Sequence, residues 1–207
     1  MPKALVAMSG GVDSSIAAWL LREQGYEVEG LFMLRGSAET GCGNHRDFEN
    51  LKAVAERLDV PVAAIDFTPQ FDTLIDEFID TYLSGRTPNP CIVCNMRNKF
   101  GRLFEEAERR GADVVATGHY ARIVHKDGQA MLCRGLDPGK DQAYSLFGIR
   151  RDRLARLMLP IGEHHKAEIR EIAAKLGLPN ADKPDSQEIC FIPDQNHSKF
   201  IHEHRPE

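Results

Sequence analysis

The sequence predicts an α/β fold: a doubly wound parallel sheet with a small helical extension at its C-terminal end. Over the first two-thirds of the 207 residues, short apolar and β-branched runs alternate with amphipathic stretches, which is the pattern of βαβ units. A glycine-rich turn directly follows the first apolar run. Ligands of such folds bind beyond the carboxyl ends of the strands, so this turn is the first candidate for a site.

Each strand and helix is predicted from the spacing of apolar residues in its own segment. The predicted strands are residues 3–8, 27–33, 61–66 and 113–117. The predicted helices, with apolar residues at helical spacing, are residues 14–24, 46–58, 71–83 and 99–110. Gly25 and Gly111 follow two of these helices, where glycine commonly ends a helix.

The C-terminal third has a different pattern. Residues 121–125 and 129–134 read as a hairpin, because the Asp127-Gly128 pair between them is a preferred hairpin turn. Helical stretches are expected at residues 151–157 and 166–176, followed by a polar tail. Residues 1–150 are therefore expected to form the main domain and residues 151–207 a helical extension.

Composition excludes several classes of protein. The apolar runs are far shorter than the roughly 20 residues that span a membrane, and the N-terminus lacks the layout of a signal peptide, so a cytoplasmic protein without a membrane partner is expected. Five scattered cysteines do not resemble the even framework of secreted disulfide proteins and favour reactive or metal-binding thiols. The net charge of −5 gives nucleic-acid binding no support beyond local patches.

The glycine-rich turn has the sequence Ser-Gly-Gly-Val-Asp-Ser from Ser9 to Ser14. Between a strand and a helix, its backbone N–H groups and the helix N-terminus can converge on an anion. It lacks the Gly-Lys-Ser/Thr of a Walker A loop and the spacing of G-x-G-x-x-G. Taken alone, it also fits a tight turn in which Asp13 or Ser14 caps the helix.

Two cysteines form a C-x-x-C pair, Cys91 and Cys94, in a proline-containing loop before a helix expected near Asn98. A helix N-terminus favours the thiolate, so the loop suits a reactive sulfur. The pair alone fits a redox couple, half of a zinc site or two packed thiols, although no second half follows at zinc-finger spacing. Cys190 lies nearly a hundred residues later.

Several motifs together resemble one family, in its order and at similar spacing. The segments are residues 9–14 (S-G-G-x-D-S), 87–95 (T-P-N-P-x-x-x-C-N), 117–122 (T-G-H-Y-A-R), 140–142 (K-D-Q) and 186–192 (S-x-x-I-C-F-I). The chain is similar to the tRNA-specific 2-thiouridylases, members of the PP-loop ATP pyrophosphatases with an adenine nucleotide alpha hydrolase-like fold. Departures from the family pattern are modest and fall at Ala7, Asn50, Ala143 and Ser145.

The resemblance implies a role for individual residues. It makes Cys94 the nucleophile and Cys190 the persulfide carrier. The implied ATP-binding residues are Ala7, Met8, Ser9, Gly10, Gly11, Val12, Asp13, Ser14, Met33 and Gly118. The implied tRNA-binding residues are Asn89, Pro90 and Cys91 at the target base, with His119, Lys140, Asp141 and Gln142 elsewhere on the tRNA.

The implied reaction is ATP-dependent 2-thiolation of the wobble uridine of tRNA. ATP with Mg²⁺ adenylates the poorly electrophilic 2-carbonyl, and sulfur that a carrier protein or desulfurase has placed on Cys190 then expels AMP. Some relatives hold an iron–sulfur cluster instead, for which Cys91, Cys94 and Cys190 would supply three thiolates. The sequence leaves both routes open.

The resemblance also implies a function for each of the two expected parts of the chain. Residues 1–150 are expected to be the PP-loop ATP-binding catalytic domain, residues 151–207 the tRNA-facing segment carrying the second cysteine, and the family's C-terminal domains to be absent. The basic run Arg150, Arg151, Arg153 and Arg156 suits either phosphates or a solvated helix face.

Two rival interpretations remain. One is another PP-loop adenylating enzyme, such as an amidating synthetase or a thiolase for a different tRNA position, which would need neither Cys94 nor Cys190. The other is a non-catalytic module that binds tRNA or a sulfur carrier, which predicts no ATP turnover.

Overall fold

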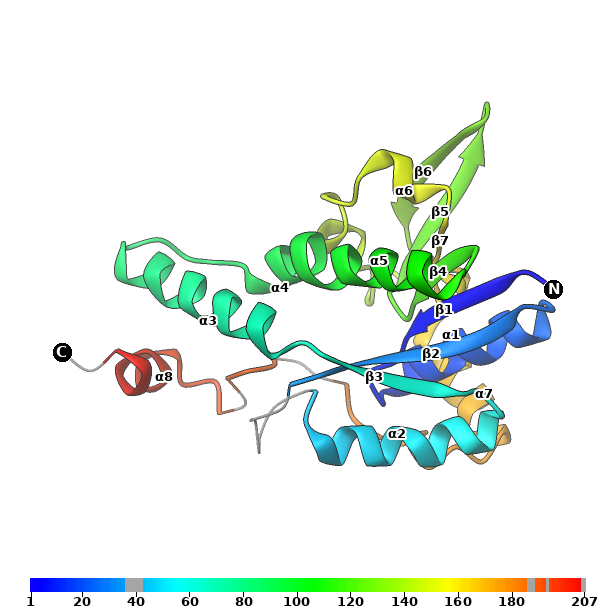
Figure 1. Ribbon diagram of the computed structural model, residues 1–207, viewed down its shortest axis with the longest axis horizontal. Coiled ribbons are helices and arrows are strands. Elements are labelled where there is room, and N and C mark those ends of the chain that lie inside the picture. Colours follow the sequence, from blue (N-terminus) through cyan, green and yellow to red (C-terminus); the bar gives the residue numbers. More distant parts are fainter. Residues whose placement is uncertain (36–42, 186–188, 193, 206–207) are drawn as a thin grey trace.

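A parallel sheet forms the centre of the computed structural model, which describes residues 1–35, 43–185, 189–192 and 194–205 (Figure 1). Within these residues the sheet has five strands in the order β3-β2-β1-β4-β7, and every neighbouring pair is parallel. The strands are β1 (Lys3–Ala7), β2 (Glu27–Leu34), β3 (Val62–Asp66), β4 (Val114–Thr117) and β7 (Leu157–Met158).

Helices cover both faces of this sheet. On one face α1 (Val12–Glu23), α2 (His45–Leu58) and α7 (Lys166–Lys175) share a core cluster with the strands. On the other face α5 (Phe100–Arg110) buries its apolar side, and Figure 1 shows it opposite the first three helices. The middle residues of β1 are buried completely, as expected of a parallel strand covered twice. The predicted doubly wound fold is confirmed.

The strand order places a topological switch point between β1 and β4. The chain runs from β1 outward through β2 to β3 and then crosses back to β4 on the other side of β1. Ligands of open α/β sheets bind at such a point, beyond the carboxyl ends of the strands. The glycine-rich turn follows β1, and Gly118 follows β4, so both predicted ATP-binding segments lie there.

The predicted hairpin is confirmed. β5 (Ala121–Lys126) and β6 (Gln129–Arg134) pair antiparallel and project from the body of the molecule (Figure 1). Asp127 and Gly128 between them have φ of 52° and 72°, the positive values that a tight hairpin turn requires. Short 3-10 helices follow at η2 (Ala143–Ser145) and η3 (Pro160–Glu163).

The prediction of a helix over residues 151–157 is wrong at the C-terminal end of that range. The helix α6 covers only Arg151–Leu154, and Leu157 begins β7 instead. Leu157 pairs with Val115 in β4 and is 2% exposed. Burial of Leu157 and its pairing with β4 therefore stabilise a strand at this position more than a longer α6 would be stabilised.

The loop expected around Cys91 and Cys94 is helical. The short helix α4 (Pro90–Val93) is followed by η1 (Cys94–Lys99), a π-helix continuous with α5. Asn89 starts this helix by accepting a hydrogen bond from the Ile92 N–H at 3.3 Å, and Pro90 occupies the first helical position, which proline favours. The helix therefore begins well before Asn98.

A third cluster lies away from the sheet, where α3 (Thr68–Leu83), α8 (His197–His204) and the segment around Phe191 meet. The rings of Phe78 and Phe191 pack edge to face at 5.3 Å. Because β7 joins the main sheet and α7 packs on α1, the two parts divided at residue 150 share one core. Their separate functional assignment stays a prediction.

Candidate active site

The glycine-rich turn is built to present backbone N–H groups. Gly10 has φ of +77°, a left-handed conformation that favours glycine. The hydroxyl of Ser14 accepts from the Ser9 N–H (3.1 Å) and donates to the Gly11 carbonyl (3.0 Å), which fixes the turn. Gly11 is the N-cap of α1 and contributes no capping side chain, so the first N–H groups of the helix suit an anion.

Gly118 packs directly on this turn. A Cβ added at Gly118 would lie 2.6 Å from the Ser14 nitrogen and 2.7 Å from the carbonyl carbon of Asp13. Only a residue without a side chain fits such an approach of two backbones. The structure thus brings Gly118 and the turn together, as the ATP-site prediction requires.

Gly118→Ala should therefore displace the turn. We expect a loss of about 1–3 kcal/mol in the free energy of unfolding, typical of overpacking, together with weaker ATP binding. Gly101→Ala is the matched control, because a Cβ there meets no atom within 4 Å and alanine in a helix gains about 0.5–1 kcal/mol over glycine. Urea unfolding and nucleotide titration measure both effects, and equal behaviour of the two variants would contradict the packing argument.

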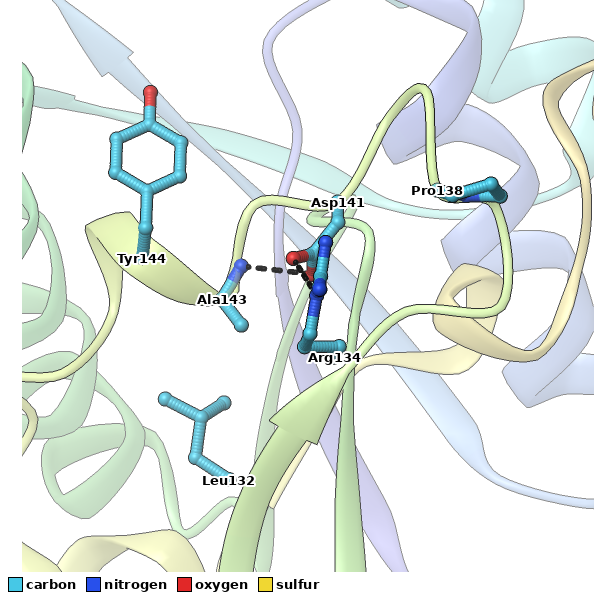
Figure 2. Close-up of a pocket in the computed structure, with 6 residues that line it drawn as sticks. All are labelled: Leu132, Arg134, Pro138, Asp141, Ala143 and Tyr144. Atoms are coloured by element: carbon cyan, nitrogen blue, oxygen red, sulfur yellow. Dashed lines mark hydrogen bonds and ion pairs between the residues drawn. The ribbon is translucent and has the colours of Figure 1, made fainter.

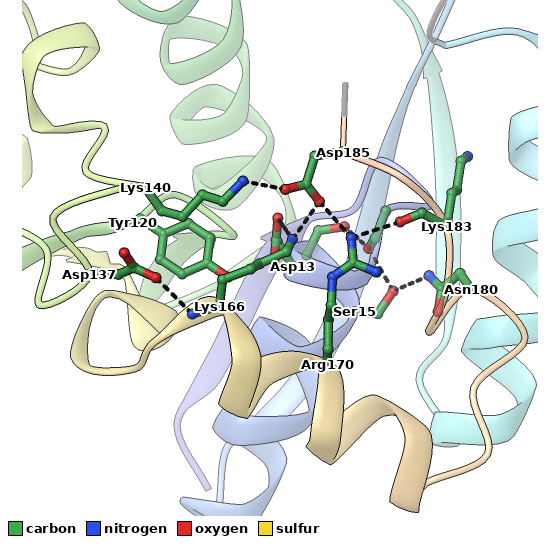
Figure 3. A network of polar contacts seen from close by, with 12 residues as sticks. Asp13, Ser15, Tyr120, Asp137, Lys140, Lys166, Arg170, Asn180, Lys183 and Asp185 are labelled. Atoms are coloured by element: carbon green, nitrogen blue, oxygen red, sulfur yellow. Dashed lines mark hydrogen bonds and ion pairs between the residues drawn. The ribbon is translucent and has the colours of Figure 1, made fainter. Parts of the chain in front are cut away.

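A buried lysine joins the turn to the C-terminal part of the chain (Figure 3). Lys166 Nζ lies 2.7 and 2.8 Å from the two carboxylate oxygens of Asp13 and 2.7 Å from Asp185 Oδ1. Only 10% of its side chain is exposed. This cation thus holds the carboxylate of the glycine-rich turn beside a carboxylate from the segment that leads to Cys190.

Asp185 gathers two further cations. Lys140 Nζ donates to Oδ2 at 2.7 Å, and an Arg170 NH group donates to Oδ1 at 3.2 Å. Burial of the Asp185 carboxyl opposes ionisation, but hydrogen bonds from Lys140 and Lys166 outweigh it and lower the pKa to about 2. The carboxylate therefore stays charged at neutral pH.

Tyr120 and Asn180 complete the enclosure of the turn. The Tyr120 hydroxyl donates to Asp13 Oδ1 at 2.9 Å, and burial, with the nearby Asp13 charge, raises the pKa of this phenol. Asn180 is buried, and its Nδ2 donates to the Gly10 carbonyl (3.1 Å) and the Ser15 hydroxyl (3.0 Å). Both residues hold the turn in shape from segments far away in the sequence.

Not every predicted ATP-binding side chain faces this region. Met8 and Val12 are 2% and 3% exposed and belong to the core cluster under α1, so they can meet a nucleotide only through their backbone. Ala7 is half-buried at the end of β1, and Met33 lies in β2 against the clusters formed by α5 and α3. The remaining predicted positions lie in the turn or at Gly118.

The two predicted catalytic cysteines pack against the same cluster of buried residues. Cys94 and Cys190 are both half-buried and both pack against the cluster of α3 and Phe191. Cys94 is the first residue of the π-helix η1, an irregularity often found at functional sites. Cys91, one turn earlier, is exposed. Cys42 lies outside the described residues.

Residues 2–194 match the family described as the tRNA methyl transferase HUP domain. The chain belongs to this family. Two relatives named tRNA-specific 2-thiouridylase MnmA are similar along essentially the whole chain. The one from Rhodopirellula baltica is 44% identical over 100% of this chain and 60% of its own length. The one from Carboxydothermus hydrogenoformans is 49% identical over 99% and 59%. The resemblance expected from the motifs is confirmed.

The chain spans about three-fifths of the length of these curated relatives. Among solved structures, a 4-thiouridine synthetase–RNA complex with bound ATP is similar with a TM-score of 0.65. It is 19% identical, and the match covers 94% of this chain and 46% of that one. At this identity the likeness shows the shared PP-loop fold.

In this member of the family, the residues predicted to touch tRNA make internal contacts. Asp141 accepts from Arg134 (2.8 Å) and from the Gly135 N–H (3.0 Å). Gln142 Oε1 accepts from the Tyr120 N–H at 2.9 Å. Lys140 is paired with Asp185, Pro90 is buried, and Asn89 caps α4. The contact of these residues with tRNA stays a prediction.

The basic run is also engaged within the protein. Arg150 pairs with Asp152, and Arg153 lies over the Phe104 ring at 5.0 Å. Arg156 donates to the backbone carbonyls of Asp113 (3.0 Å) and Ala112 (2.9 Å). Arg151 donates to Gln129. Because α6 is a single turn, the run does not form the continuous helix face that was expected.

His119 is held in the neutral form. Thr117 Oγ1 and His119 Nδ1 share a hydrogen bond at 2.7 Å, and the Phe100 ring lies 5.9 Å from the imidazole. The residue keeps some exposed surface, but its ring is enclosed. Burial of the ring, and then the positive charge of Lys99, lower its pKa from 6.5 to about 3.

We therefore expect the His119 ring signals in an NMR titration to stay unchanged from pH 8 to pH 5, with assignment by a His119→Gln variant. The unfolded chain takes up this proton near pH 6.5 and the folded chain only near pH 3. Acidification between these values therefore favours unfolding through this residue. A midpoint near pH 6 for His119 would contradict the enclosure of its ring.

Sequence reasoning missed Lys166, Arg170, Asn180 and Asp185. Lys166 and Arg170 are four apart, a spacing that puts both on one face of α7, and this was the only available signal. Nothing in the local sequence indicated that Lys166 would pair with Asp13, 153 residues away.

Proposed function

We propose that this chain is the ATP-using catalytic part of a tRNA-uridine 2-sulfurtransferase that thiolates the wobble uridine. The observation that carries the proposal is the packing of Cys94 and Cys190, distant in sequence, against one cluster in a PP-loop fold. The relatives named tRNA-specific 2-thiouridylase support the substrate and the reaction. A plain adenylating enzyme would need no such pair of thiols.

In the ATP step the glycine-rich turn binds the phosphates through backbone N–H groups. The uridine O2 attacks the α-phosphorus of ATP, the bond to pyrophosphate breaks, and an O-adenylated base forms. Mg²⁺ takes one or two carboxylates together with phosphate oxygens. Asp13, in the turn, is the carboxylate that would hold it, and the ion would neutralise charge on the leaving pyrophosphate. Lys166 places both carboxylates beside the turn.

In the sulfur step Cys190 carries a persulfide received from a donor protein. In one version the Cys94 thiolate attacks the inner sulfur of Cys190, which forms a Cys94–Cys190 disulfide and releases hydrosulfide. The hydrosulfide attacks C2 of the base and expels AMP, and a dithiol reductant then restores both cysteines. In the other version the terminal persulfide sulfur attacks C2 itself and expels AMP. The Cys94 thiolate then attacks the Cys190 sulfur, which breaks the bond to the transferred sulfur, releases the 2-thiouridine and forms the same disulfide. Both versions need the two thiols close together.

An iron–sulfur cluster would require a third ligand in the same place. Among the described residues, which include Cys91, Cys94 and Cys190, no group of three or more His, Cys, Asp or Glu side chains is arranged to hold a metal ion. As placed, the three cysteines do not form a ligand set, so we derive no step through a cluster. Iron analysis of an anaerobic preparation tests this route.

The proposed partners are tRNA and a persulfide-donating carrier or desulfurase, with the cytoplasm as the compartment. Within the part of the chain that the structure describes, no helix has both the length and the apolar character to cross a membrane.

The proposal is tested by incubating the chain with tRNA, ATP, Mg²⁺ and a persulfide donor, and by measuring pyrophosphate and 2-thiouridine in digested tRNA. We expect tRNA-dependent pyrophosphate release and 2-thiouridine at the wobble position. Pyrophosphate release with sulfur at a different position, or with no sulfur, would favour another PP-loop enzyme. No ATP turnover with any tRNA would favour a binding module.

A further inference from the structure

Two large aromatic side chains lie exposed near the cysteine-bearing helix. Tyr144 is 63% exposed and Phe147 is 66% exposed, whereas Ser145 and Leu146 between them are buried. The Leu146 N–H donates to the Ala143 carbonyl at 3.1 Å, which closes the 3-10 helix η2. Tyr144 lies within this helix, and Phe147 lies two residues beyond its end. We call Tyr144 and Phe147 the aromatic platform.

The platform is fastened to the segment that follows Cys94. The buried Asn95 side chain donates from Nδ2 to the Ser145 carbonyl (3.2 Å) and hydroxyl (3.3 Å). On the other side, Gly148 packs so closely on Met96 that an added Cβ would lie 2.3 Å from its side chain. The two residues after Cys94 therefore contact the platform segment at two points, so its position relative to Cys94 is defined.

A surface groove adjoins the platform (Figure 2). It has a volume of about 580 Å³ and is lined by Leu132, Arg134, Pro138, Asp141, Ala143 and Tyr144. The ion pair with Asp141 (2.8 Å) holds the Arg134 guanidinium in place while 75% of the Arg134 side chain stays exposed. In Figure 2 the Tyr144 ring stands on one side and the Arg134–Asp141 pair on the other. Planar guanidinium groups and aromatic rings are the surfaces on which unpaired bases stack.

We propose that the aromatic platform stacks on the unpaired tRNA bases that flank the target uridine. The inference rests on the proposed function and identifies how the same site holds its RNA. A base that undergoes chemistry must leave its stack, so its neighbours lose a stacking partner. The exposed rings, on the segment that contacts Asn95 and Met96, replace it. Stacking also suits a chain of net charge −5, because it adds affinity without phosphate contacts.

The test uses an anticodon stem-loop RNA carrying the target uridine, at one fixed salt concentration. Tyr144→Ala and Phe147→Ala should each weaken binding about 5- to 150-fold, the range for loss of one stacked base. Tyr144→Phe keeps the ring and should bind like the unsubstituted chain. Leu83→Ala removes a side chain that is also 63% exposed, at the end of α3, and should leave binding unchanged.

A second measurement reports stacking directly. 2-Aminopurine placed next to the target uridine should lose fluorescence on binding the unsubstituted chain or Tyr144→Phe, and keep more of it with Tyr144→Ala. If the alanine variants match the unsubstituted chain in affinity and quenching while 2-thiouridine still forms, the platform is wrong and the proposed function stands. Slower sulfur transfer from a protein donor with unchanged RNA binding would make the surface a protein-docking site, which also overturns the platform. If the unsubstituted chain neither binds the RNA nor thiolates it, both proposals are overturned.

Discussion

Serine at Cys94 or at Cys190 should abolish thiolation, by on the order of 10³-fold or more as for other lost nucleophiles, and leave tRNA-dependent pyrophosphate release intact. The reason is spatial. Both thiols pack against the cluster of α3 and Phe191, whereas the glycine-rich turn follows β1 at the switch point of the sheet. With labelled persulfide donor, Cys190→Ser should accept no sulfur, and Cys94→Ser should accept it and fail to pass it on.

Cys133→Ser is the matched control for these variants. Cys133 is half-buried like Cys94 but lies in β6 of the hairpin, and its replacement should leave thiolation unchanged. Cys91→Ser separates the persulfide route from the iron–sulfur cluster route. Only the cluster route predicts that this variant is as inactive as Cys94→Ser and Cys190→Ser and that it binds less iron. Near-normal thiolation by both Cys94→Ser and Cys190→Ser would show that the sulfur-transfer assignment is wrong and leave an ATP-binding fold.

Lys166→Met should have the largest effect on stability. It leaves the carboxylates of Asp13 and Asp185 beside each other without their shared cation. Removing one partner of a buried pair costs about 3–5 kcal/mol, and because Asp13 and Asp185 side chains are 29% and 20% exposed, we expect about 2–4 kcal/mol after solvent screening. Pyrophosphate release should fall as well, because Lys166 holds Asp13 in the turn.

Lys199→Met is the control, because Lys199 also bridges two acids, Asp194 at 3.3 Å and Glu203 at 4.0 Å, but is 56% exposed. Urea unfolding should show a change within about 0.5 kcal/mol for this surface lysine. Asp13→Asn combined with Lys166→Met should cost less than the sum of the single variants, since the two residues form one interaction. An additive result, or equal losses from the two lysines, would contradict the network.

The same network predicts the acid behaviour of the protein. The folded pKa of Asp185, about 2, lies below its ordinary value of 3.8. The stability that this group contributes is therefore fully present above about pH 4 and is lost as the pH falls from there through 2. In Lys166→Met this component should shrink, which a pH series of urea unfolding curves would measure.

Local patterns predicted most of the sheet, and for a clear reason. β1, β2 and β4 contain buried apolar residues, and β3 is a half-buried apolar run; such runs can be recognised in the sequence without knowledge of the neighbouring strand. Asp127-Gly128 encodes its own turn through backbone conformation. The glycine-rich turn needs a residue at positive φ, and Gly10 at that position is visible in the sequence itself. The assignment of Cys94 and Cys190, in contrast, came from resemblance to relatives rather than from spacing.

Long-range contacts decided the rest. β7 is a strand only because Leu157 and Met158 pair with β4. The early helix start at Asn89 and Pro90 is, by contrast, a local capping signal that apolar periodicity does not reveal. The pairing of Lys166 with Asp13 joins residues 153 positions apart, and the exposure of Tyr144 depends on which neighbours are buried. Apolar spacing and turn chemistry therefore encode the elements and the glycine-rich turn. The charged network, the packing of both cysteines against one cluster and the aromatic platform depend on contacts between distant residues. A single charged or aromatic residue in the sequence does not indicate which residue it will contact.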